Sequence, residues 1–259
     1  MTRVIAITNQ KGGVGKTTTS VNLAAGLSQS GKNVLLVDLD PHGNATMGSG
    51  IDKRSLEATV YQVLLGLSTA ETVRLRSEAG GYDVLPANRD LAGAEVELVN
   101  LENREARLKS ALATISAHYD FILLDCPPSL SMLTVNGLVA ADAVIIPMQC
   151  EYFALEGLSD LVNTIRKVRQ NLNPRLEIEG LLRTMFDPRN TLAQQVSAQL
   201  QQHFGGKVYD TVIPRNVRLA EAPSYGSPAV NLDRACKGSQ AYLALAGEML
   251  ARVAAFETA

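Results

Sequence analysis

A glycine-rich segment near the N-terminus carries the clearest chemical signal in the chain. The sequence KGGVGKTT occupies residues 11–18, after a short apolar run and before a stretch with helical spacing. Glycines let successive backbone N–H groups turn towards one anion at the start of a helix. Lys16 is then placed to contact the terminal phosphates of a nucleotide, and the Thr17 hydroxyl is placed to bind Mg²⁺. The segment therefore predicts a phosphate-binding loop.

This loop departs from the common phosphate-loop pattern, which has a glycine five positions before the glycine that precedes the lysine. Gln10 stands at that position, so the strict pattern fails. Lys11 adds a second lysine to the loop, where it repels Lys16 unless it points elsewhere. The alternative interpretation is a glycine-rich turn that precedes a helix and binds nothing, but acidic residues elsewhere in the chain supply the rest of a nucleotide site.

These acidic residues follow the ends of predicted strands. Asp38 and Asp40 follow the apolar run 34–37, and Asp125 follows the run 121–124. In open α/β sheets, ligands bind beyond the carboxyl ends of the strands, so we expect these side chains near the loop. Asp125 is placed to hold Mg²⁺ through water, and Asp38 to support the metal from a greater distance. The alternative for each is a helix cap or a turn former.

Short apolar runs rich in β-branched residues alternate with longer helical patterns along the chain. This alternation predicts an α/β fold with a mostly parallel, twisted sheet and helices on both faces. Strands are expected at residues 4–7, 34–37, 82–85, 121–124, 143–146, 178–182 and 212–213. Helices are expected at residues 17–30, 104–117, 155–170, 192–204 and 241–256. No linker or repeat divides the sequence, so residues 1–259 are expected to form a single domain.

Composition excludes several classes of protein. A chain of 259 residues with 46% hydrophobic and 19% charged residues is neither disordered nor fibrous. Its three cysteines are isolated in sequence, which argues against a disulfide framework or a thiolate zinc site and fits a reducing cytoplasm. No apolar run approaches the roughly 18 to 20 residues of a membrane span. The formal net charge of −2 excludes a surface that is basic throughout.

Five segments together resemble the deviant Walker A ATPases of the ParA and Soj family, in which the extra lysine reaches the ATP of a dimer partner. They are ITNQKGGVGKTT at 7–18, LVDLDP at 36–41 with GNAT at 43–46, DCPPS at 125–129, QCEYFALEG at 149–157 and VIPRNVR at 212–218. The resemblance covers nearly the whole chain and implies a P-loop NTPase fold. One departure is His42, where the family usually has glutamine. His42 either tunes turnover as a neighbour of the phosphates or is a substitution tolerated in a polar loop.

The resemblance implies roles for individual residues. Lys11, Lys16 and Asp40 would be catalytic, with Asp40 orienting or polarising the attacking water. Mg²⁺ would be held by Thr17, Asp40 and Asp125. Glu151 would reach a ribose across the dimer, while Thr184 and Pro214 would lie near the adenine. The nucleotide-binding set is thus Lys11, Gly12, Gly13, Val14, Gly15, Lys16, Thr17, Thr18, Glu151, Thr184 and Pro214.

The same resemblance implies an ATP-dependent partition switch. MgATP would close two subunits into a homodimer that binds DNA non-specifically. A ParB-type centromere-binding partner would then stimulate a weak ATP hydrolysis and release the dimer from DNA. Such a protein would be cytoplasmic and associated with the nucleoid, and no membrane contact is expected. The cargo is left open by the sequence, because a chromosome, a plasmid or a protein assembly would use the same switch.

A local excess of positive charge is the expected DNA-binding feature. Residues 161–219 contain four acidic and nine basic residues, the latter being Arg166, Lys167, Arg169, Arg175, Arg183, Arg189, Lys207, Arg215 and Arg218. Arg189 and Arg218 match positions that the family uses to contact DNA. Because the chain has no tryptophan and the stretch lacks interleaved aromatic residues, phosphate contacts would dominate over base stacking. The alternative is a solvated surface whose arginine stems cover apolar groups.

Two other classes of protein share this kind of loop. A MinD-like membrane-cycling ATPase that positions the division site or another cargo requires a basic amphipathic C-terminal helix. The segment 241–256 has Arg252 as its only basic residue, which makes it a poor candidate. An iron–sulfur reductase of the nitrogenase iron-protein type requires paired ligand cysteines at a dimer interface. Cys126 follows a predicted strand and is instead expected in the core.

Overall fold

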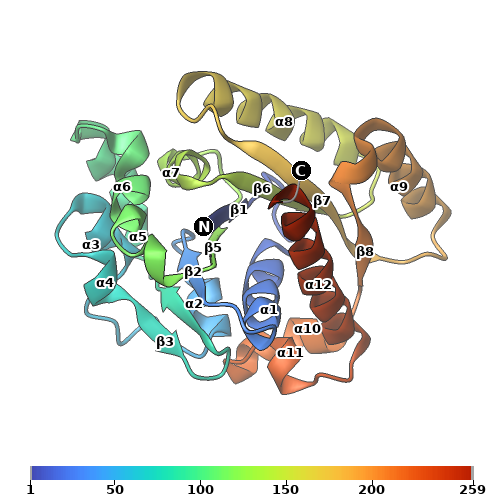
Figure 1. The fold of residues 1–259 in the computed structure, drawn as a ribbon, viewed down its shortest axis with the longest axis horizontal. Coiled ribbons are helices and arrows are strands. Elements are labelled where there is room, and N and C mark those ends of the chain that lie inside the picture. The colour runs from blue at the N-terminus through green and yellow to red at the C-terminus, as the bar shows by residue number, and fades with distance from the viewer. Residues whose placement is uncertain (1, 258–259) are drawn as a thin grey trace.

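A sheet of eight strands runs through the part of the chain that the computed structural model describes, residues 2–257, and helices cover both faces (Figure 1). The strand order is β3-β4-β2-β5-β1-β6-β7-β8. Within those residues every pairing is parallel except that of the edge strand β3 with β4, which is antiparallel. The predicted fold class, an α/β protein with a mostly parallel sheet, is confirmed.

The strands match the sequence prediction at seven of the eight positions. They are β1 (Arg3–Ile7), β2 (Val34–Asp38), β3 (Leu75–Ser77), β4 (Tyr82–Leu85), β5 (Phe121–Asp125), β6 (Ala143–Met148), β7 (Glu177–Phe186) and β8 (Val208–Pro214). Strand β3 was not predicted because two of its three residues are exposed, so no apolar run marks it. Strands β2 and β5 are buried at every position, as expected for parallel strands covered on both faces.

The number and bounds of the helices differ more from the sequence prediction than those of the strands do. They are α1 (Lys16–Gln29), α2 (Asn44–Gly48), α3 (Val60–Leu65), α4 (Ala70–Val73), α5 (Leu91–Glu97), α6 (Arg107–Ala113), α7 (Met132–Ala140), α8 (Ala154–Asn171), α9 (Thr191–Phe204), α10 (Val217–Glu221), α11 (Ala229–Leu232) and α12 (Lys237–Glu257). The single helix expected at 104–117 is wrong, because α6 is flanked by separate 3₁₀ turns at Arg104–Ala106 and Ser116–His118. Ile115 leaves the helical conformation with φ −121° and is buried in the core.

Two hydrophobic clusters lie on opposite faces of the sheet. Because successive side chains of a strand point to opposite faces, Ala6 of β1 joins one cluster while Ile5 and Ile7 join the other. Helices α3 to α9 contribute to the first cluster, and α1, α2 and α10 to α12 contribute to the second (Figure 1). The sheet is therefore held between two layers of helices. None of the described helices is both long and apolar enough to cross a membrane.

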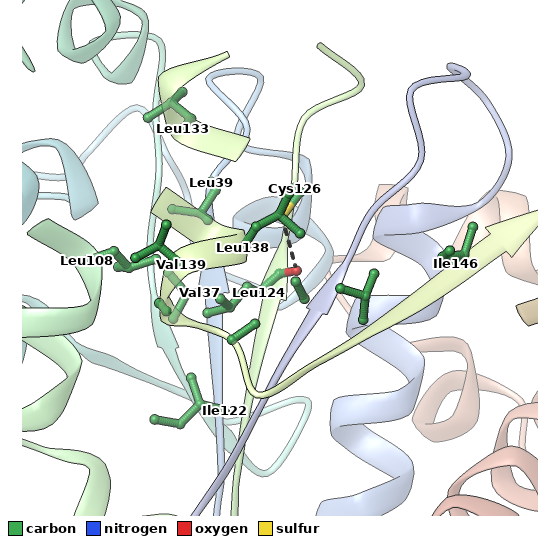
Figure 2. Packing of buried hydrophobic residues seen from close by; sticks show 14 of the residues in the cluster. Val37, Leu39, Leu108, Ile122, Leu124, Cys126, Leu133, Leu138, Val139 and Ile146 are labelled. Carbon is green, nitrogen blue, oxygen red and sulfur yellow. Dashed lines mark hydrogen bonds between the residues drawn. The ribbon is translucent and has the colours of Figure 1, made fainter. Parts of the chain in front are cut away.

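Helix α7 packs closely against the end of β5. Cys126 lies among Leu39, Leu138 and Val139, and its thiol faces the Leu124 carbonyl oxygen at 3.8 Å (Figure 2). Burial raises the pKa of this thiol well above its ordinary value. A Cβ atom on Gly137 of α7 would lie 2.9 Å from Cys126 Sγ. Cys126 is thus a packed core residue, as expected, and is not exposed as a ligand for an iron–sulfur cluster.

Candidate functional site

The phosphate loop joins β1 to α1 at the carboxyl end of the sheet. Gly13 has φ +74° and Gly15 has φ +87°, a region of the backbone map that side chains with a Cβ atom rarely adopt. Gly15 is the N-cap of α1, and no side chain of the described residues caps the first turn. The N–H groups of this turn are therefore available to an anion. Between the two glycines, Val14 is buried and anchors the loop.

Lys16 points back across the loop. Its Nζ donates a hydrogen bond to the Lys11 carbonyl oxygen at 3.0 Å, and the residue is only 7% exposed. Burial lowers the pKa of the ammonium group, while the charges of Asp125 and Asp40 oppose that effect. A buried cation that faces both the loop and the carboxylates is suited to hold a phosphate chain.

Asp125 lies directly beneath the first turn of α1. Its Oδ2 accepts a hydrogen bond from Thr17 Oγ1 at 2.8 Å, and its Oδ1 accepts one from Ser20 Oγ at 2.8 Å. Burial and the neighbouring Asp38 both raise the pKa of this carboxyl group, because they disfavour its negative charge. The threonine hydroxyl and the carboxylate are oxygen ligands of the kind that Mg²⁺ prefers, and a divalent cation would compensate the buried charge.

Asp38 anchors the segment that follows β2. Its Oδ2 accepts hydrogen bonds from the backbone N–H and the hydroxyl of Thr46, at 2.8 and 2.7 Å, and its Oδ1 accepts the Asp40 N–H at 3.1 Å. Burial raises the pKa of Asp38, the largest of several effects on this group. The supporting role that the sequence predicts for Asp38 at a metal stays a prediction; in this structure its hydrogen bonds hold the start of α2 against the sheet.

Asp40 is the third carboxylate of the site. Its charge acts on both Lys16 and Asp125, which places it in the same electrostatic neighbourhood. Asp40 Oδ1 accepts the His42 backbone N–H at 2.9 Å and lies 2.6 Å from His42 Nδ1. The chain then turns at Gly43, which has φ +61° and approaches the Ala87 carbonyl oxygen so closely that a Cβ atom would collide with it.

Lys11 points away from Lys16, towards the rim of the site. Its Nζ lies 2.5 Å from Glu151 Oε2, and both side chains are about half exposed, at 50% and 52%. The next two residues, Tyr152 and Phe153, are exposed aromatic side chains in edge-to-face contact. The lysine and the glutamate that the resemblance directs across a dimer are therefore paired within one chain here.

A family profile described as an AAA domain matches residues 2–178. Soj of Bacillus subtilis, the sporulation initiation inhibitor protein, is 54% identical over 97% of this chain and 99% of its own length. The chromosome partitioning protein ParA of Caulobacter vibrioides is 53% identical over 96% of this chain and 94% of its own length. The chain belongs to the ParA and Soj family of chromosome-partitioning ATPases.

A solved structure with a bound nucleotide is also similar to this chain. Cobyrinic acid a,c-diamide synthase from Mycobacterium smegmatis, with bound ADP and magnesium, is 41% identical to this ParA/Soj family member. The match covers 96% of this chain and 94% of that one, with a TM-score of 0.85. The same protein has been solved with an ATP analogue and magnesium.

The two residues predicted near the adenine do lie together in this ParA/Soj family member. Thr184 and Pro214 line one pocket of about 140 Å³ that also includes Gly15 and Thr18 of the loop region. Thr184 Oγ1 donates a hydrogen bond to the Val14 carbonyl oxygen at 2.8 Å, which ties β7 to the phosphate loop. This pocket therefore lies directly beside the phosphate loop.

The predicted basic surface contains one buried member. Arg183 is 9% exposed and donates hydrogen bonds to Ser197 Oγ at 2.8 Å and to the Tyr209 carbonyl oxygen at 2.7 Å, so it belongs to the core and not to the surface. Arg189 is exposed and pairs with Asp187, and its hydrogen bonds lower the pKa of Asp187 to about 2. Arg218 is exposed and contacts two acidic residues, Glu221 and Asp233.

Two polar residues that organise the site, Ser20 and Thr46, were not predicted from the sequence. Ser20 contacts Asp125, and the Thr46 hydroxyl both donates to Asp38 and accepts the Ala87 N–H at 2.9 Å. The contact between Ser20 and Asp125 could have been predicted, because Ser20 lies four positions after Lys16 on the helix face towards the sheet. Thr46 lies in the GNAT segment, but its partners are distant in sequence, so no local pattern indicates them.

Proposed function

We propose that this protein binds MgATP at the phosphate loop and hydrolyses it to drive DNA partition. The observation that carries the proposal is the arrangement at the start of α1. A buried Lys16 faces the loop, and Thr17 contacts the buried carboxylate of Asp125, whose negative charge is disfavoured by burial and by the neighbouring Asp38. Mg²⁺ would be held by Thr17 and, through water, by Asp125, and it would neutralise charge on the phosphates. Thr184 and Pro214 would bound the adenine.

Hydrolysis requires an oriented water and compensation of the charge on the transferred phosphoryl group. Asp40 would orient the water. Unlike Asp125, it accepts no hydrogen bond from Thr17 or Ser20, and it lies beyond the end of its strand. Lys16 would contact the β- and γ-phosphates. Lys11 would contribute in a dimer, where it would reach the nucleotide of the partner.

Dimer closure would require Lys11 to exchange its partner. In the single chain its ammonium group is paired with Glu151 at a half-exposed position, and exposed ion pairs of this kind are weak. Two subunits that approach face to face over two nucleotides would bring each lysine to the other subunit's phosphates. Glu151 would then be free to contact a ribose across the interface. The exposed Tyr152 and Phe153 would be covered on closure.

The closed dimer would hold DNA non-specifically through Arg189 and Arg218 and would be released when a ParB-type partner stimulates hydrolysis. The names of the relatives support the partition role, and the exposure of both arginines supports the DNA contacts. Their present partners are surface carboxylates, which a DNA phosphate can replace. The protein would then be cytoplasmic and associated with the nucleoid.

Co-sedimentation tests this proposal against a membrane-cycling role. We expect the protein to sediment with non-specific DNA in MgATP and to remain in solution in MgADP. We expect no binding to anionic liposomes with either nucleotide. Arg252 of α12 is tied to Glu248 and to two backbone carbonyl groups, so it offers a bilayer no free basic face. ATP-dependent binding to liposomes without DNA binding would favour the MinD-like alternative, and binding to neither would contradict the partition proposal.

A further inference from the structure

His42 makes an unusual double contact with the carboxylate of Asp40. Its backbone N–H donates to Oδ1 at 2.9 Å, and its ring Nδ1 lies 2.6 Å from the same oxygen. An ionised carboxylate only accepts hydrogen bonds, so we assign the proton of this contact to Nδ1. The imidazole is 75% exposed, whereas the Asp40 side chain is 11% exposed. The ring therefore covers one oxygen of a nearly buried carboxylate from the solvent side.

This contact leaves the two oxygens of Asp40 unequal. Both donors from His42 reach Oδ1, and among the described residues no donor reaches Oδ2. The terminal torsion of an aspartate is broad and roughly two-fold, so a carboxylate held by one donor can rotate. A second donor on the same oxygen restricts that rotation and keeps Oδ2 available to an outside donor such as a water molecule.

The backbone beneath Asp40 is held independently of the imidazole. Asp40 donates its own N–H to Asp38, and Asp38 is fixed to Thr46 by two hydrogen bonds. Lys53 Nζ donates to the His42 carbonyl oxygen, which supports the turn from outside. A substitution at position 42 keeps the backbone N–H donor and removes only the ring donor. The ring contribution is thus separable from the fold of the loop.

We propose that the His42 imidazole is a positioning residue that orients the Asp40 carboxylate for its contact with the attacking water. The proposal rests on the role proposed for Asp40 in hydrolysis. The ring does not need to touch the nucleotide, since it acts through Asp40 alone. Its loss leaves MgATP binding intact and slows the chemical step, because one oxygen of the carboxylate is no longer fixed.

Three substitutions at this position separate the donor from the bulk of the ring. His42→Phe keeps an aromatic ring without a donor, and His42→Ala removes both. His42→Asn places an amide N–H donor at the same number of bonds from the backbone as Nδ1. We expect the rate of phosphate release at saturating MgATP to fall roughly ten- to hundredfold in the first two variants. The asparagine variant is expected to stay within about threefold of the parent, with the KM for ATP and the thermal midpoint unchanged in all three.

The controls distinguish failure of this inference from failure of the proposed function. Asp40→Ala is expected to lose turnover more severely than His42→Phe; if it keeps parental turnover, the proposed role of Asp40 is wrong. If Asp40→Ala loses turnover while His42→Phe keeps it, only the positioning role of His42 is wrong. Equal losses in His42→Phe and His42→Asn, or a comparable loss in Lys53→Ala, would show that the loop and not the ring donor matters, which also overturns the inference.

Discussion

Lys16 is the residue on which the nucleotide site depends most directly. Its ammonium group is buried, faces the loop, and lies close enough to Asp125 and Asp40 for both charges to act on it. Without it the phosphates of a nucleotide would meet two carboxylates with no side-chain cation between them. Backbone N–H groups alone carry partial charges, and a charge-assisted hydrogen bond is roughly twice as strong as a neutral one.

We therefore expect Lys16→Ala to abolish MgATP binding. Loss of a hydrogen bond to a charged group costs about 1.5–3 kcal/mol, and the uncompensated carboxylates add repulsion. Calorimetric titration with MgATP measures the effect, with Lys109→Ala on the exposed surface of α6 as the control for loss of a positive charge. An affinity within threefold of the parent would contradict the role proposed for Lys16.

At this scale the sequence indicates which residues gather at the phosphate loop but not which residues support them. Thr17 and Asp125 could be predicted because a loop glycine pattern and a strand end each mark a fixed position in this kind of sheet. The contacts of Asp38 could not, because its partner Thr46 lies eight residues away on a helix that has only five residues. Such supports depend on how separate loops meet in the folded chain.

Among the elements, α7 is positioned by close packing and carries no sequence pattern that would predict it. The helix is apolar on most of its surface and largely buried, so it lacks the one-sided spacing by which amphipathic helices are predicted. Its approach to β5 depends on Gly137, where a Cβ atom would lie 2.9 Å from Cys126 Sγ and 3.1 Å from Leu39 Cδ1. The contact fixes the strand end that carries Asp125.

We expect Gly137→Ala to destabilise the protein despite the better helix propensity of alanine. Overpacking a core costs about 1–3 kcal/mol, which exceeds the roughly 0.5–1 kcal/mol gained by replacing a helical glycine. Gly247→Ala in α12 is the matched control, because its added Cβ atom meets no other group within 4 Å. Chemical denaturation should show a lower free energy of unfolding for Gly137→Ala and a slightly higher one for Gly247→Ala. Equal stabilisation of both variants would mean that α7 can shift at no cost.

The central strands were predictable for the physical reason that they are buried on both faces. The sequences of β2 and β5 are therefore nearly unbroken apolar runs, whereas the exposed edge strand β3 has no such run. Helices α2, α10 and α11 have five residues or fewer, too short for a helical repeat to be visible. Helices α8 and α9 were predicted to within a residue at each end, whereas α12 begins four residues before the predicted start.

For the whole molecule, the decisive question is whether two copies close over the phosphate loops. Gly12 lies exposed on the loop, and a Cβ atom there would meet no other group within 4 Å. The single chain therefore has room for a larger side chain at this position. A defect caused by such a side chain must arise outside the chain, where a second subunit would approach.

We accordingly expect Gly12→Val to bind MgATP but to remain a monomer. Sedimentation velocity in MgATP measures the state, and calorimetry confirms that the nucleotide is bound. Gly206→Val, at another exposed glycine with open space around it, controls for the effect of a β-branched residue on a surface loop. A stable ATP-dependent dimer of Gly12→Val would rule out face-to-face closure over the loops.

The proposed DNA contacts belong to the scale of the assembled molecule, because they would require both a closed dimer and an exposed basic surface. We expect the double variant Arg189→Glu, Arg218→Glu to lose DNA co-sedimentation in MgATP while it still binds ATP and dimerises. Neither side chain takes part in the hydrogen bonds of the phosphate loop, and both are exposed, at 88% and 53%. The reversed charges would repel DNA phosphates whatever the base sequence.

A matched control is available in the same chain. Arg54 pairs with Asp52 two residues before it, as Arg189 does with Asp187, and Arg76 pairs with Asp83. The double variant Arg54→Glu, Arg76→Glu changes the net charge equally but lies outside the basic stretch. If the contacts are to phosphates, each lost contact reduces the slope of log affinity against log salt by about 0.9. Parental DNA binding across a salt series in the Arg189 and Arg218 variant, or an equal loss in the control, would place the DNA-binding surface elsewhere on the dimer.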